Sequence, residues 1–239
     1  MSHLKNQMQI KTDMLLNTYL NGEDNLMDQA QECDYRKPQR VTFTEDENKF
    51  PWLSVLLDAY AVIDKGVSAA IEREHKAGRE LACAKGCSSC CSTHQDIPVY
   101  PLELMGMSWY VIEKLQSPLR EQLRAQLEKF ETISSCPFLL EGACSIHPMR
   151  PIACRQFNVL DQACAEGEDA FHTRRLDVMK PIEHFTDEAF DVMLPFYGVK
   201  KKAERRKAIK KGALHALAKV MRDCNWQTLP EKMTAFDSK

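Results

Sequence analysis

Seven of the ten cysteines in this chain of 239 residues fall into two short clusters, at residues 83–91 and 136–154. Thiolates a few residues apart can bind one metal centre, because the chain between them closes a tight loop. A helical hairpin expected over residues 101–131 would let the chain leave this site and return to it. The seven candidate ligands are Cys83, Cys87, Cys90, Cys91, Cys136, Cys144 and Cys154.

Other interpretations of these cysteines were weighed against metal binding. Free cysteines are common in protein cores, which suits the isolated Cys33 and Cys224 but not four cysteines within nine residues. The adjacent Cys90 and Cys91 could instead form a redox-active pair. Seven close thiols would repel one another as thiolates unless a cation held them. Metal binding is therefore the favoured interpretation.

The metal is expected to be zinc or the iron of an iron–sulfur cluster. Structural zinc takes four Cys or His ligands, and a [4Fe–4S] cluster also takes four, so some cysteines are surplus. The surplus implies a second metal, spare redox groups, or cysteines that only pack. Irregular spacing, adjacent cysteines and the Cys136-Pro137 pair favour iron–sulfur slightly.

Arg150 and Arg155 flank Cys154, and Pro151 stiffens the turn between them. A thiolate-ligated centre is negatively charged, so guanidinium groups beside it would stabilise it and tune its potential. We therefore predict that both arginines support the centre. Ordinary surface arginine is the alternative, with equal weight.

Three further residues are weaker candidates. His147 follows Cys144 by three positions, and His94 follows the first cluster closely. Because the cysteines already suffice as ligands, a surface or turn histidine is the favoured interpretation of both. Cys164 could also contribute, although its Asp- and Glu-rich neighbourhood is typical of an exposed segment.

The two clusters together resemble the bacterial cysteine-cluster family that carries the label CxxCxxCC, described as zinc- or iron-chelating proteins. The first cluster is followed in the same order by CPFL (136–139), CSIH (144–147) and RPIACRQF (150–157). The resemblance covers residues 80–160 and implies metal binding, but no general biochemical activity. Three residues separate Cys83 from Cys87, where the family has two, so the position of Cys83 departs from the family's pattern. A related branch, the flagellin lysine methylases, shares a cysteine cluster of this type, which points to iron–sulfur chemistry.

The rest of the chain predicts a mainly α fold around an irregular cysteine-rich centre. Nine glycines are few for this length, and apolar residues recur at helical spacing. Helices are expected at residues 52–81, from residue 102, after Ser117-Pro118, at 186–194 and at 200–225. Their apolar faces are as follows: Leu53, Leu57, Tyr60, Ile63, Val67 and Ala70; then Leu102, Met105, Trp109, Ile112 and Leu115; then Leu119, Leu123, Leu127 and Phe130. Residues 97–101 are expected to be extended.

Three regions are predicted along the chain. Residues 1–50 read as a helical and polar arm, with a weak amphipathic helix at residues 10–20. Residues 51–195 form the metal-binding domain, and residues 196–239 contribute a basic helix packed on that core. No signal peptide or long apolar run is evident, so the cytoplasm is the expected compartment.

Residues 200–211 carry eight basic residues against one acidic residue. They could bind an acidic protein or a nucleic acid, although a solvated basic helix face is the favoured interpretation. With a net charge of −2, the whole chain is not attracted to nucleic acid or membrane. Two functions stay open. One is an iron–sulfur oxidoreductase or electron carrier. The other is a structural-zinc protein that binds a partner through the basic helix.

Overall fold

The computed structural model describes residues 37–84, 86–132 and 134–238. The chain divides into two units, Met1–Lys37 and Pro38–Lys239, and all the described helices and strands belong to the second. The helix expected at residues 10–20 and the isolated Cys33 lie outside the described residues.

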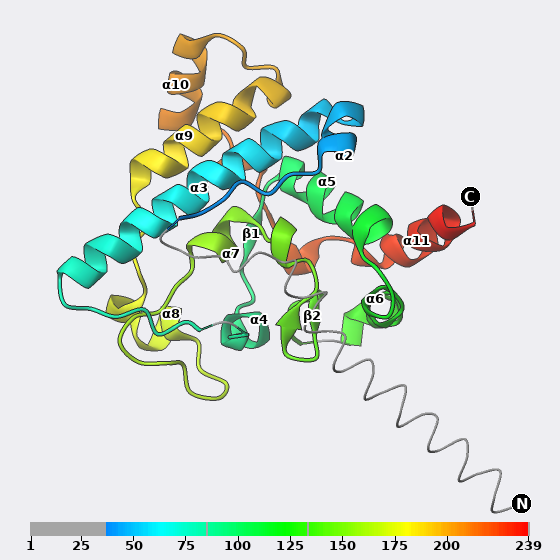
Figure 1. The fold of residues 1–239 in the computed structure, drawn as a ribbon, viewed down its shortest axis with the longest axis horizontal. Coiled ribbons are helices and arrows are strands. Elements are labelled where there is room, and N and C mark those ends of the chain that lie inside the picture. The colour runs from blue at the N-terminus through cyan, green and yellow to red at the C-terminus, as the bar shows by residue number, and fades with distance from the viewer. Residues whose placement is uncertain (1–36, 85, 133, 239) are drawn as a thin grey trace, which may run out of the picture. The chain divides into compact units, whose positions relative to one another are not determined.

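The second unit is mainly helical, as the sequence predicts (Figure 1). Its α-helices are α2 (Thr44–Lys49), α3 (Pro51–Lys76), α4 (Ser89–Thr93), α5 (Pro101–Trp109), α6 (Leu119–Glu128), α7 (Ile152–Gln156), α8 (Ala170–Thr173), α9 (Glu183–Met193), α10 (Lys202–Lys210) and α11 (Leu229–Asp237). Short 3₁₀ or π turns are η1 (Tyr110–Lys114), η2 (Phe130–Thr132), η3 (His147–Met149), η4 (Arg175–Asp177), η5 (Leu194–Tyr197), η6 (His215–Leu217), η7 (Met221–Asp223) and η8 (Trp226–Thr228).

The longest helix, α3, buries the apolar face that the sequence predicts, and no residue of that face is more than 5% exposed. It begins at Pro51, where proline suits a first helical turn, and ends at Lys76, short of the predicted residue 81. Helix α9 packs along it (Figure 1). Gly66 permits this close approach, because a Cβ there would lie 2.6 Å from the Cβ of Phe185. Helix α3 is thus the scaffold on which α2, α5, α7 and α9 pack.

The chain between the cysteine clusters folds into α5, η1 and α6, and the core that they bury matches the predicted stripes only in part. Met105 and Leu119 are each 39% exposed, whereas Leu123 and Leu127 are fully buried. Met105 faces outward because the buried Glu103, two residues earlier, turns the opposite side of α5 inward. A carboxylate that holds backbone N–H groups therefore sets the orientation of this helix.

Two small antiparallel sheets complete the unit. Strand β1 (Pro98–Val99) pairs with β4 (Lys219–Val220), which confirms an extended segment within the expected residues 97–101, although Pro101 already begins α5. Strand β2 (Leu139–Leu140) pairs with β3 (Ala143–Cys144) in a hairpin inside the second cysteine cluster.

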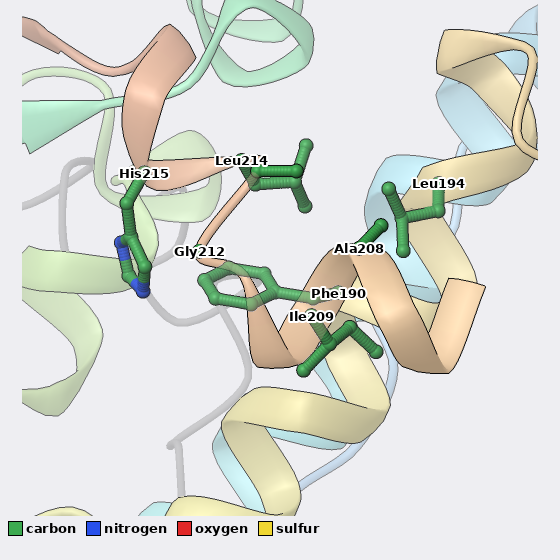
Figure 2. A pocket seen from close by; sticks show the side chains of 8 residues that line it. Phe190, Leu194, Ala208, Ile209, Gly212, Leu214 and His215 are labelled. Atoms are coloured by element: carbon green, nitrogen blue, oxygen red, sulfur yellow. The ribbon is translucent and has the colours of Figure 1, made fainter. Parts of the chain in front are cut away.

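The prediction of one long basic helix at residues 200–225 is wrong. Helix α10 ends at Lys210, because Gly212 takes a φ of +64°, a conformation that ends helices. The chain then turns into η6, β4, η7 and η8 before α11 begins. Figure 2 shows this turn beside α9 and α10, where Leu214 and His215 line a small apolar recess with Phe190. Across the described residues, no helix is both long enough and apolar enough to cross a membrane.

Candidate metal centre

The first cysteine cluster ends in the single-turn helix α4. The backbone N–H of His94 donates to the carbonyl of Cys90 at 3.0 Å, which closes this turn. Residues four apart lie on one face of a helix, so Cys90 and His94 are neighbours. Each side chain accordingly affects the pKa of the other: the neighbouring Cys90 thiol raises the pKa of His94.

The two clusters meet through a backbone hydrogen bond. The N–H of Cys136, in the second cluster, donates to the carbonyl of Cys91, in the first, at 2.7 Å. Phe138 and Ile146 hold the second cluster in place, since each is 1% exposed and belongs to the core between α6 and α11. Figure 1 shows α4 beside the β2–β3 hairpin. The fold thus brings together segments that are far apart in the sequence.

Five thiols lie around this junction: Cys90, Cys91, Cys136, Cys144 and Cys154. A hydrogen bond with Cys136 raises the pKa of Cys91 to about 12. Burial raises the pKa of Cys144, and burial together with the neighbouring thiols Cys144, Cys91 and Cys90 raises that of Cys154. Thiols in such surroundings are neutral at pH 7. Metal binding would therefore displace their protons, because only the thiolate is a good ligand.

Cys83 and Cys87 lie to one side of this group. The Cys83 thiol accepts a hydrogen bond from the N–H of Val159 at 3.2 Å, and its pKa is raised to about 11 by burial. Cys87, Cys90 and Cys164 are its electrostatic neighbours, and Cys87 is exposed. Cys90 is thus the neighbour that Cys83 shares with the thiols at the junction.

Helix α7 carries Cys154 and is anchored by Glu103 of α5. The buried carboxylate accepts hydrogen bonds from the N–H of Ile152 at 2.7 Å and from the N–H of Tyr100 at 3.0 Å. Burial raises the pKa of Glu103 to about 7 in spite of these bonds. This one side chain fixes the start of α7 against the start of α5, and with it the position of Cys154.

Arg150 and His147 lie on the other side of the thiols. Arg150 Nη1 is 2.6 Å from His147 Nε2, and burial together with the charge of Arg150 lowers the pKa of His147 to about 4. His147 is therefore neutral and accepts from Arg150, so its Nε2 is already occupied. Arg150 Nε is buried and has no hydrogen-bond partner among the described residues, although the Arg150 charge acts on Cys144 and Cys154.

Arg155 is held by backbone carbonyls and by α3, and its charge also acts on Cys144. Its Nε and Nη2 donate to the carbonyls of Arg150 and Pro148 at 2.9 and 2.6 Å, and Nη1 donates to Asp64 of α3 at 2.7 Å. The guanidinium also lies over the Tyr60 ring, 4.0 Å from its centroid. Arg155 therefore clamps the 148–150 turn to α3.

The donor set at the junction fits zinc or an iron–sulfur cluster. Thiolates are the preferred ligands of both, and the unpaired buried Nε of Arg150 is a donor suited to a negatively charged centre. None of the nine described cysteines is in a disulfide. Within the described part of the chain, no three Cys, His, Asp or Glu side chains already have metal-binding geometry. The thiols lie close together, and binding of the metal would set their final orientation.

Sequence reasoning underrated one pair, His94 and Asp169. His94 Nε2 lies 2.8 Å from Asp169 Oδ1, although the two residues are far apart in the sequence. The cap motif at α8 is the one signal that marks Asp169: its Oδ1 also accepts from the N–H of Phe171 at 2.9 Å. Nothing in that motif indicates that the carboxylate reaches a histidine of the first cluster.

Comparison with known families agrees with this geometry. The model of the CxxCxxCC family, described as "Putative zinc- or iron-chelating domain", matches residues 82–176. The match confirms the resemblance drawn from the sequence and supports metal binding. It contains all five thiols at the junction together with His94, Asp169 and Cys164. No curated protein and no solved structure matches the chain.

Proposed function

We propose that residues 82–176, the segment that matches the CxxCxxCC family, hold an iron–sulfur cluster through thiolates from both cysteine clusters. The observation that carries this proposal is the hydrogen bond between Cys136 N–H and the Cys91 carbonyl, because it joins the two clusters at one place. A [4Fe–4S] cluster takes four protein ligands, and the five thiols there would supply most of them. Cys83 and Cys87 would be surplus or serve a second role beside Cys164.

When bound, such a cluster supplies one-electron redox chemistry. The protein would then act as an electron carrier or as the redox part of an oxidoreductase. This role requires access from solvent, and Cys87 is exposed while Cys90 and Cys91 are partly exposed. Reduced thiols also suit the cytoplasm, which remains the compartment that we expect.

The second candidate is a structural-zinc protein that binds a partner through its basic helix. Zinc would then link the two cysteine clusters and stabilise the fold. Helix α10 is exposed along most of its length, and Arg205 is held by Asp191 of α9 at 2.8 Å. The other basic side chains of residues 200–211 would be the ones to meet an acidic protein or a nucleic acid.

Anaerobic purification of the full chain tests the proposal and separates the two candidates. We expect a brown protein whose iron and sulfide are lost in a Cys91→Ser variant. A Cys224→Ser variant is the matched control, because Cys224 donates to the Val220 carbonyl at 3.4 Å and serine can do the same. A colourless protein with stoichiometric zinc would favour the second candidate. A protein with neither metal would exclude both.

The side chain of Arg150 offers a finer test. In an Arg150→Gln variant we expect the fold to persist but metal affinity to fall by about 10–100-fold, as is typical when a group that supports the ligands is lost. With an iron–sulfur cluster, the reduction potential should also fall, because a positive charge near the added electron is gone. Lys201→Gln is the control, since Lys201 is exposed and pairs only with Glu204. Equal affinities and potentials in the two variants would show that Arg150 does not act on the centre.

A further inference from the structure

His94 is placed as a metal ligand would be, although the cysteines alone could satisfy one centre. It follows α4 directly, one turn after Cys90, and its backbone N–H donates to the Cys90 carbonyl at 3.0 Å. The ring is half-buried and packs edge-on against Phe157, with centroids 4.2 Å apart. The imidazole is therefore held between the Phe157 ring and the segment that carries the Cys90 thiol.

The hydrogen bond to Asp169 sets which ring nitrogen can bind. A carboxylate only accepts, so His94 Nε2 must donate to Asp169 Oδ1 across their 2.8 Å separation. In the neutral ring, the lone pair is then on Nδ1. Histidines that bind metals usually donate their second ring N–H to a carboxylate or carbonyl, which fixes the ring and strengthens the ligand. The His94–Asp169 pair has this arrangement.

Asp169 is itself fixed and does not simply neutralise a surface charge. It caps the start of α8, where its Oδ1 accepts from the N–H of Phe171. Side-chain exposures of 14% for His94 and 21% for Asp169 distinguish this pair from exposed ion pairs. His172 also lies near Asp169, at 3.9 Å from Oδ2, but its side chain is 72% exposed.

We propose that His94 binds the metal through Nδ1, with Asp169 as the residue that orients it. The centre would then have a mixed donor set, three thiolates from the junction and one imidazole. This inference deepens the proposed function and depends on it. It also explains why Cys90 and His94 share one face of α4, whereas Cys91 turns towards Cys136.

The test uses the full chain as purified, in the wild type and in the variants His94→Ala, His94→Cys, Asp169→Asn and His172→Ala. If elemental analysis finds zinc, X-ray absorption should show one nitrogen at about 2.0–2.1 Å beside three sulfurs at about 2.3 Å. If it finds iron, pulsed electron paramagnetic resonance of the reduced protein should show coupling to one ¹⁴N nucleus.

We expect His94→Ala to lose the nitrogen signal and most of the metal. His94→Cys should retain metal with an all-sulfur shell, which would show that the alanine variant fails through a missing ligand and not through misfolding. Asp169→Asn should keep the nitrogen and bind about 10–100-fold more weakly. His172→Ala, the matched control, should behave as the wild type.

The possible failures are distinguishable. A wild-type protein that binds metal through sulfur alone, or a His94→Ala variant with unchanged metal affinity, would overturn the ligand assignment and leave the proposed function standing. A wild-type protein that holds no metal at all would overturn the proposed function itself.

Discussion

Removing the metal should lower the melting temperature of this protein by about 10 °C or more. Metal binding to a site that the unfolded chain lacks contributes directly to folding, with about 10–16 kcal/mol for structural zinc in small peptides. Even a loss of about 5 kcal/mol would lower the melting temperature of a domain of this size by about 10–20 °C. Scanning calorimetry before and after treatment with a chelator, under anaerobic conditions, measures the change.

Removing the metal should destabilise the cysteine-rich segments locally as well as lower the stability of the whole fold. Residues 83–91 and 136–155 form few regular elements, so without metal they should become sites of limited proteolysis, whereas α3 and α9 should stay protected. Re-adding the metal should reverse both effects. Identical melting curves and digestion patterns with and without metal would show that the fold does not depend on the centre.

An Arg155→Gln substitution should strongly destabilise the fold. The Arg155 side chain is 4% exposed, and its partner Asp64 is 16% exposed. Removing one partner of a buried ion pair typically lowers the free energy of unfolding by about 3–5 kcal/mol, because the other charge is left uncompensated. Chemical denaturation would measure this loss. The 148–150 turn would also lose its clamp, so metal content should fall together with stability.

Two comparisons sharpen the Arg155 experiment. Arg124→Gln is the control, because Arg124 pairs with Asp237 at 3.4 Å on the surface, where such pairs contribute little. Adding Asp64→Asn to Arg155→Gln should recover part of the stability, since the stranded carboxylate is then neutral. If Arg155→Gln unfolds at the same denaturant concentration as Arg124→Gln, the clamp has no energetic role.

Local pattern predicted the helical scaffold well. The α3 face could be predicted because six apolar residues recur at helical spacing, and periodicity of that kind is visible in the sequence itself. The basic helix was extended too far because alanine, leucine and lysine favour helix on both sides of Gly212. The positive φ at that glycine shows that the chain turns there, and the chain after it returns to pair β4 with β1.

The metal centre could be predicted as a set of ligands but not as an arrangement. Cysteine spacing predicts the two clusters, yet it cannot show that Cys136 of the second lies against Cys91 of the first. The sequence predicts Arg155 beside the thiols because it is next to Cys154. The contacts of Arg155 with Asp64 and Tyr60 of α3 cannot be predicted from that spacing. Contacts between segments that are distant in the sequence cannot be predicted from the spacing of neighbouring residues.

The hydrogen bond that joins Cys91 to Cys136 also constrains when the centre can be assembled. The ligands occur on both sides of α5 and α6, so the first cluster emerges from the ribosome long before the second. Closing that loop carries an entropic cost that the packing of α5 and α6 must offset first. We therefore expect metal insertion to follow the folding of the intervening helices. Until then Cys90 and Cys91 would lack the protection of a bound metal, and delivery of the metal would compete with their oxidation.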